Sequence, residues 1–249
     1  MCGRTGDAPG EFAIRVMVDL TSEMAELWTS LGAPTAGPTR AIQFVAAATG
    51  EGASTVAREF AFFASKRARK GVWLVDLDLA EAPQHRAIAA EAGRYGALGK
   101  PSAASPDGSA FFTVQPPTRS KEGAVWPDAR FLVAYPVGGP RLWVTRFRCE
   151  ALQQPPQTVH LLPTDAYWQA LRRHAELIVV DAPALDVSTS ALTVAARMDA
   201  NVIVLAADAR DAGRAAALKS EIQKAGGRVA GLVFNKARPS APSLRRQAT

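Results

Sequence analysis

The sequence is poor in the residues that build metal centres and disulfide frameworks. Its 249 residues include two cysteines, Cys2 and Cys149, and three histidines, His85, His160 and His174, all far apart in the chain. Two isolated cysteines form neither a disulfide framework nor a paired-cysteine metal motif. We therefore expect no metal site built on cysteine or histidine.

Long apolar runs are also missing. No stretch of about 18 uninterrupted apolar residues occurs, so the sequence predicts no membrane-spanning helix. The first residues, MCGRTGDAPGEF, contain no apolar segment of the kind that secretory signals carry. These two absences lead us to expect a cytoplasmic protein.

Acidic residues are outnumbered by basic ones. The chain has 23 Asp and Glu against 29 Lys and Arg, which gives a net charge of +6. Such an excess suits nucleic acid, anionic lipid or an acidic partner, and an ordinary basic surface is an equal alternative. No long Lys/Arg block is interleaved with aromatic residues, so we expect no nucleic-acid partner.

The chain does contain a regular alternation of apolar segments and helical patterns, which begins near residue 41. The helical patterns cover residues 21–32, 54–70, 165–175, 190–198 and 211–227. The strand-like runs cover residues 42–48, 72–78, 130–137, 141–145, 158–163, 177–181, 201–207 and 228–236. We predict that Thr21 or Ser22 caps the first helix and that Gly71 ends the second.

This alternation predicts a doubly wound α/β fold of three layers, with a mostly parallel sheet covered on both faces. We divide the chain into residues 1–40 (tail, short helix and linker), a single domain at 41–238, and a loose tail at 239–249. Within the domain, residues 93–157 diverge most. Their first part, 93–128, is rich in Gly, Pro and Ser, which predicts irregular surface structure.

A glycine-rich stretch, TGEGAST at residues 49–55, lies between the first strand of the domain and a helix. Phosphate-binding loops have the pattern Ala/Gly-x-x-x-x-Gly-Lys-Ser/Thr in this context, and their backbone N–H groups hold phosphate oxygens. Ala47, Gly52 and Ser54 fit the pattern, whereas Ala53 stands at the lysine position. A glycine turn with a Ser/Thr helix cap explains the same residues without a ligand.

Polar residues also follow other predicted strands. Asp76 and Asp78 end the second strand, Asp181 ends the run LIVVD, and Asn235 ends the last strand. Ligands of parallel sheets bind at the carboxyl ends of strands, where carboxylates hold Mg²⁺ or activate an attacking group. Acids that merely cap turns are the alternative for any one position, but three at one edge favour a site.

Together these segments resemble a known family. IQFVAAATGEGAST, VWLVDLDLAEAPQHR, ELIVVDAP and AGGRVAGLVFNK are similar, in sequence and order, to motifs of the bacterial tyrosine kinases. These cytoplasmic ATPase modules regulate exopolysaccharide chain length and are related to the MinD/ParA ATPases. The family motifs run PGEGKST, LLIDADLRRPxLHR, VIIDTPP and GxxxxGxVLN, and the resemblance covers roughly residues 21–236.

The resemblance implies a P-loop NTPase fold and a set of site residues. The loop residues that would contact ATP or ADP and Mg²⁺ are Gly50, Glu51, Gly52, Ala53, Ser54 and Thr55. Asp76 and Asp78 match the acids after the second strand, Asp181 matches the Walker-B acid, and Asn235 matches the adenine-side asparagine. Ser54, Asp76 and Asp181 would hold Mg²⁺. In an active enzyme Asp76, Asp78 and Asp181 would be catalytic.

Several departures from the family pattern bear on activity. Ala53 replaces the loop lysine, and Ala48 replaces the signature lysine of the ParA type. The C-terminal tyrosine cluster is missing, and the N-terminal oligomerisation motif keeps Glu23 but has Glu26 and Thr29 in place of its two arginines. Arg58, Arg40 and Arg210 are candidates for a substitute cation, and solvated surface arginines are the alternative.

These observations support three hypotheses. The first is a regulatory or scaffolding partner in exopolysaccharide biosynthesis, in which nucleotide binding is weak or lost. It would lie peripherally at the inner membrane, bound to a membrane-embedded polysaccharide co-polymerase. Both a monomer and a homo-oligomer are compatible with the sequence. The second is an active ATPase or tyrosine kinase with a substitute cation. The third is a MinD/ParA-like positioning ATPase, which the missing signature lysine disfavours.

Overall fold

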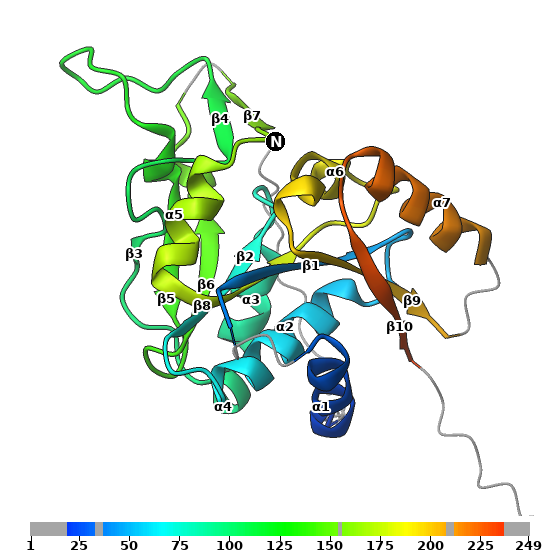
Figure 1. Cartoon of the computed structure of the whole chain (residues 1–249). Helices are drawn as coiled ribbons and strands as arrows, with labels where there is room; N and C mark the ends of the chain where they lie inside the picture. The colour runs from blue at the N-terminus through cyan, green and yellow to red at the C-terminus, as the bar shows by residue number, and fades with distance from the viewer. Residues whose placement is uncertain (1–18, 33–36, 154–155, 208–211, 237–249) are drawn as a thin grey trace, which may run out of the picture.

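A computed structural model describes residues 19–32, 37–153, 156–207 and 212–236, and its centre is one eight-stranded sheet (Figure 1). The predicted loose tail at residues 239–249 and the first 18 residues of the predicted segment 1–40 lie outside the described residues. The strand order is β10-β9-β1-β8-β2-β6-β5-β3. The strands are β1 (Arg40–Ala46), β2 (Gly71–Asp76), β3 (Ser102–Ala103), β5 (Leu132–Pro136), β6 (Leu142–Phe147), β8 (Ala175–Asp181), β9 (Ala200–Ala206) and β10 (Val229–Asn235).

The sheet is mostly parallel, as the sequence predicts. From β10 to β6 all neighbouring strands are parallel, and only β5 and β3 add to that edge in antiparallel fashion. β5 and β6 form the predicted hairpin, in which Tyr135 faces Val144. Parallel strands need crossover segments that cover the faces of a sheet, which explains why the central strands are continuous apolar runs.

Helices cover both faces of the sheet (Figure 1). On one face lie α1 (Thr21–Ser30), α2 (Ala53–Ser65), α3 (Pro83–Ala90) and α4 (Ala92–Tyr95); on the other lie α5 (Ala166–His174), α6 (Ser190–Val194) and α7 (Ala212–Lys224). Alternate strand residues point to the two layers: Ile42 and Phe44 pack toward α2, and Ala41 and Val45 toward α5 to α7. This confirms the doubly wound, three-layer α/β fold.

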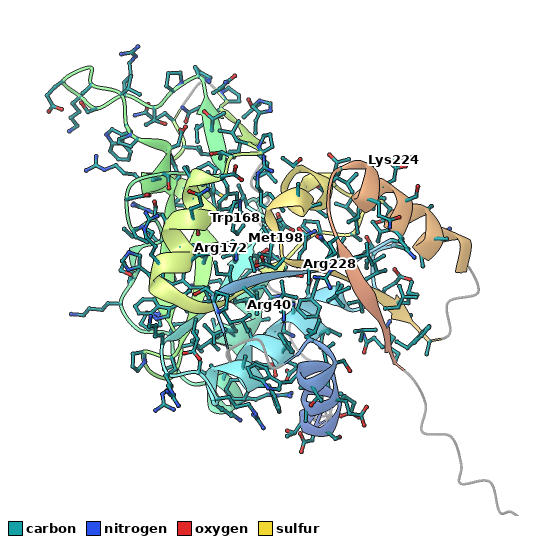
Figure 2. The ribbon with its side chains drawn as sticks, in the orientation of Figure 1. Arg40, Trp168, Arg172, Met198, Lys224 and Arg228 are labelled. Carbon is teal, nitrogen blue, oxygen red and sulfur yellow. The ribbon has the colours of Figure 1, made fainter. Side chains whose placement is uncertain are left out.

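The layer that contains α5 is built around aromatic side chains. Trp168 of α5 is fully buried, and its ring lies 5.3 Å from that of Phe111 and 5.2 Å from that of Tyr167. Met198 belongs to the same buried cluster (Figure 2). Phe111 comes from the segment 93–128, so the interpretation of that segment as surface structure is partly wrong.

The divergent segment 93–157 is integrated into the domain. It supplies β3, β5 and β6 to the main sheet, and its strand β4 (Phe112–Gln115) pairs with β7 (Thr158–Leu161) in a separate two-stranded sheet. Phe112 at the start of β4 is buried against Phe147 of β6, with ring centroids 5.3 Å apart. Burial of these aromatic rings outweighs the loop-like composition around them.

Two helix boundaries differ from the predictions. α1 begins at Thr21, but neither Thr21 nor Ser22 caps it; Leu20 occupies the cap position and the Asp19 carboxylate accepts the Thr21 N–H at 3.0 Å. α2 ends at Ser65, and Gly71 begins β2 rather than ending the helix. Glu176 of β8 accepts the backbone N–H groups of residues 69 and 70, which draws this part of the chain out of the helix.

α1 packs on α2 through its apolar face. Met24 is buried, and the ring of Trp28 lies 6.1 Å from Phe60 and 6.0 Å from Phe63. The opposite face presents Glu23 and Thr29 to solvent. No helix within the described ranges is long and apolar enough to span a membrane.

Candidate phosphate site

The parallel topology brings the predicted site residues to one edge of the sheet. The loop that contains Gly52 follows β1, which lies between β9 and β8. Asp76 and Asp181 are register partners at the ends of β2 and β8. Asn235 ends β10, and its side-chain Nδ2 donates to the Glu51 carbonyl at 2.9 Å. Strand ends far apart in the sequence thus meet around the loop.

The loop adopts a conformation that depends on its glycines. Gly50 has φ +86° and Gly52 has φ +93°, a left-handed region that other residues rarely adopt. Gly52 is also the N-cap of the 13-residue helix α2, and a Cβ atom there would lie 1.9 Å from the Asn235 Nδ2. Glycine at position 52 therefore serves both the turn and the close approach of Asn235.

The N-terminus of α2 offers unused hydrogen-bond donors. The backbone N–H groups of Gly52, Ala53, Ser54 and Thr55 donate to no acceptor among the described residues. Free N–H groups at a helix N-terminus, together with the helix dipole, favour an anion such as phosphate. The loop and the start of α2 therefore form a candidate phosphate site, which we call the phosphate cradle.

Two carboxylates already bind the first part of the loop. The Glu51 Oε2 accepts the Ala48 N–H at 3.0 Å, and Asp186 accepts both the N–H and the hydroxyl of Thr49. These donors lower the pKa of Asp186. Asp186 was not predicted as a site residue. It could have been identified from the sequence, because it follows Asp181 by five residues in the segment that leaves β8. The carboxylates make the mouth of the loop acidic.

Asp76 and Asp181 form a buried acid pair. Each side chain belongs to a residue only 2% exposed. Burial, followed by repulsion from Asp181, raises the pKa of Asp76 well above its usual range. Burial raises the pKa of Asp181 to about 6, although hydrogen bonds from Gln84 and Ser54 oppose that rise. The pair therefore resists carrying two negative charges.

Gln84 of α3 ties this acid pair to the loop. Its backbone N–H donates to the Asp76 Oδ2 at 2.9 Å, and its Nε2 donates to the Asp181 Oδ2 at 2.6 Å and to the Ser54 carbonyl at 2.8 Å. Gln84 is fully buried and also accepts from Arg58 at 3.2 Å. The family motif has leucine at this position. A polar residue in place of that leucine could have identified Gln84 as a site residue from the sequence.

Asp78 lies outside the acid pair. Its own N–H donates to the Asp76 Oδ1 at 3.0 Å, and its carboxylate accepts the Glu81 N–H at 3.0 Å. The chain then passes through Ala82 in a left-handed conformation, φ +45°, before α3 begins. Asp78 therefore shapes the turn that delivers Gln84.

The predicted substitute cations do not fill the lysine position. Arg58 donates to Gln84 and to the Tyr95 hydroxyl, both at 3.2 Å. Arg40 begins β1, at the opposite end of that strand from the loop, and bonds to the Leu31 carbonyl. Arg210 lies outside the described residues. Ala53 itself is buried in the apolar cluster beneath α2.

The residues present fit a nucleotide's phosphates better than they fit a metal. The free N–H groups of the cradle suit phosphate oxygens, whereas the described residues contain no cluster of three or more His, Cys, Asp or Glu able to hold a metal. The buried Asp181 Oδ1 has no hydrogen-bond partner. Mg²⁺ keeps few protein ligands and binds with substrate phosphates, so an ion arriving with ATP would find Asp181 and Ser54.

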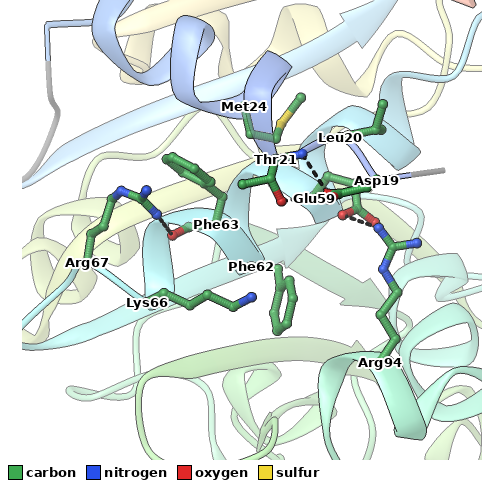
Figure 3. A pocket seen from close by; sticks show the side chains of 10 residues that line it. All are labelled: Asp19, Leu20, Thr21, Met24, Glu59, Phe62, Phe63, Lys66, Arg67 and Arg94. Carbon is green, nitrogen blue, oxygen red and sulfur yellow. Dashed lines mark hydrogen bonds and ion pairs between the residues drawn. The ribbon is translucent and has the colours of Figure 1, made fainter. Parts of the chain in front are cut away.

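A cavity of about 550 Å³ lies at the other end of α2, between α1 and α4 (Figure 3). Lys66, Arg67 and Arg94 line it, and Arg94 forms an ion pair with Glu59 at 2.7 Å. Because the phosphate cradle is at the N-terminus of α2, this cavity is not part of that site.

Comparisons with known proteins agree with this geometry at the level of fold. No family model and no curated protein sequence matches the chain. Among solved structures, the VpsO kinase domain matches over 88% of this chain and 95% of its own, with 17% identity and a TM-score of 0.54. The kinase domain of the Escherichia coli tyrosine kinase ETK matches over 89% and 78%, with 15% identity and a TM-score of 0.55.

A third structure, the chimerical protein CapA2B2, matches over 90% of this chain and 88% of its own, with 14% identity and a TM-score of 0.55. Identities this low establish a shared fold and leave activity open. The match covers the main sheet and its flanking helices, because it extends over about nine tenths of this chain. The chain therefore has the P-loop fold of the bacterial tyrosine kinase domains.

Proposed function

We propose that this protein is a non-catalytic relative of the bacterial tyrosine kinase module that regulates exopolysaccharide assembly or export. The observation that carries the proposal is Ala53 at the lysine position of an otherwise formed phosphate loop. Lysine neutralises the charge that develops during phosphoryl transfer, and removal of such a group commonly lowers the rate by about 10²–10³.

The acid pair supports the same conclusion. Both carboxylate oxygens of Asp76 accept backbone N–H groups, and Gln84 donates to Asp181 from inside the site. Acids committed to internal hydrogen bonds are poor ligands for a catalytic metal until those bonds break. The arrangement favours a stable, closed site over a site poised for turnover.

The three tyrosines of this sequence do not form a cluster like the one in the kinase family. They are Tyr95, Tyr135 and Tyr167, and none lies near the C-terminus. Tyr167 is fully buried, and Tyr95 donates its hydroxyl to Glu59. Tyr167 and Tyr95 are therefore poor substrates for phosphorylation in the folded protein.

The proposed partner is a membrane-embedded polysaccharide co-polymerase, which would hold this protein at the inner membrane. The motif resemblance and the kinase-domain fold support this partner. Regulation by a bound module needs the fold and its surface, and it does not need ATP turnover. An active ATPase with another cation is the alternative, and hydrolysis assays separate the two.

Deletion of the gene tests the proposed role directly. We expect the deletion strain to change the amount or chain length of its surface polysaccharide, measured by gel filtration of the purified polymer. Complementation with the wild-type gene should restore the original profile. An unchanged polysaccharide in the deletion strain would remove the basis for this function.

A further inference from the structure

Acidic side chains surround the phosphate loop. Glu51 and Asp186 bind its backbone, and the Asp76/Asp181 pair lies beneath it. Coulomb repulsion between these groups and a polyphosphate opposes binding unless a cation is near. In a loop with free N–H donors but without a lysine at position 53, a cation from another part of the chain would therefore favour phosphate binding.

Lys236, directly after β10, brings an ammonium group to the loop. Its Nζ donates to the Gly50 carbonyl at 2.7 Å. The preceding residue, Asn235, bonds to the next carbonyl of the loop, that of Glu51. An ammonium has three donors, and among the described residues only the Gly50 carbonyl is bonded to this one. Lys236 is exposed, so its remaining N–H groups are accessible to a ligand.

The backbone at Lys236 is held in an unfavourable conformation. Its φ is +58°, and within the described ranges Ala82 is the one other non-glycine residue with positive φ. Both border the candidate site: Ala82 precedes α3 and Gln84, and Lys236 contacts the loop. Left-handed conformations of non-glycine residues are strained and concentrate at functional sites.

Within the part of the chain that the structure describes, two other cations near the loop, Arg58 and Arg214, interact with different groups. Arg58 donates to Gln84 and Tyr95. Arg214 of α7 lies close enough to Asp186 to help lower its pKa. Lys236 differs from both because its hydrogen bond is to the phosphate loop itself.

We propose that Lys236 supplies the cation of the phosphate loop, binding nucleotide phosphate from the end of β10 in place of the lysine missing at position 53. This inference rests on the proposed function and on the loop binding a nucleotide. It adds that the protein retains nucleotide binding, although it has no lysine at position 53 to support catalysis. The ligand class is a nucleoside di- or triphosphate.

Titration calorimetry with Mg-ADP on the full chain tests this proposal. We expect Lys236→Ala to weaken binding by about 10- to 100-fold, the range for loss of a charge-assisted hydrogen bond. Lys236→Arg should recover most of the affinity. The matched control is Lys224→Ala, which removes an exposed lysine at the far end of α7 and should bind as the wild type does (Figure 2).

A double-mutant cycle separates a phosphate-binding role from a structural one. If the two lysines serve the same phosphate, Lys236→Ala should cost less than about threefold once Ala53→Lys is present. Equal losses in both backgrounds would mean that Lys236 only tethers the loop, and this would overturn the proposal. The proposal would also be overturned if Lys236→Ala bound Mg-ADP as tightly as the wild type, or if the wild type did not bind Mg-ADP. Neither result would decide the role in polysaccharide assembly, which the deletion strain tests separately.

Discussion

Replacement of Ala53 by lysine should tighten Mg-ATP binding by about 10- to 100-fold. A charge-assisted hydrogen bond contributes roughly 1.5–3 kcal/mol, and each 1.4 kcal/mol is tenfold in affinity. Position 53 is the first residue of α2, beside the unused N–H groups of Gly52 and Ser54. The new ammonium would join donors that are already arranged for phosphate. Titration calorimetry of wild type and Ala53→Lys measures the gain.

The control for this gain is Gln223→Lys, which adds the same charge on an exposed position of α7. It should leave affinity unchanged, because exposed charges more than about 10 Å apart are screened at ordinary salt. If Ala53→Lys binds Mg-ATP no better than the wild type, or if the control gains as much, position 53 is not the lysine position of a phosphate loop.

Asp181→Asn should stabilise the protein at pH 8. The folded state raises the pKa of Asp181 from 3.8 to about 6, so folding holds a proton that the unfolded chain releases. The free energy of unfolding therefore falls as the pH rises from about 4 to about 6. Above that range Asp181 is ionised in the folded protein, and the buried carboxylate destabilises the fold. Two units of pKa correspond to about 3 kcal/mol, or a rise in Tm of roughly 6–12 °C for a chain of this size.

The pH dependence identifies the cause. At pH 4 the wild-type carboxyl is largely protonated in the folded state, so Asp181→Asn should change Tm little. Asp107→Asn is the control, because hydrogen bonds from Ser109 lower the pKa of that exposed carboxyl, and no gain at pH 8 is expected. Calorimetric melts at both pH values measure the difference. Equal effects of Asp181→Asn at pH 4 and pH 8 would contradict the buried-acid account.

The sheet and the position of the site were predictable because buried parallel strands leave a strong signal. Runs such as VWLVD and LIVVD are apolar on both faces up to their last residue, and the acids that end such parallel strands must lie at one edge of the sheet. That logic placed Asp76, Asp181 and Asn235 around the loop, and the structure brings all three there.

The connections within the site were not predictable. Gln84 reaches Asp181 across 97 positions of sequence, and it does so because Ala82 adopts a left-handed turn that no pattern signals. Lys236 was overlooked for a similar reason, since its side chain crosses from the end of β10 to Gly50. Contacts of this kind depend on side-chain reach in three dimensions and on backbone conformations that propensity disfavours.

Composition misled in one region for an identifiable reason. The segment 93–128 carries many Gly, Pro and Ser residues, which predict surface loops. Phe111 and Phe112 nevertheless lie buried in the cluster beneath α5. Two adjacent aromatic side chains are enough to anchor an otherwise irregular segment, since burial of each contributes roughly 1.5–3 kcal/mol.

ATP hydrolysis by the purified protein at saturating Mg-ATP shows whether the phosphate loop has lost catalysis. The background is set by Asp76→Ala, which removes an acid that an active enzyme would need. We predict that phosphate release by the wild type does not exceed that of the variant. Mg²⁺-dependent turnover in the wild type that Asp76→Ala abolishes would contradict the account and identify an active enzyme.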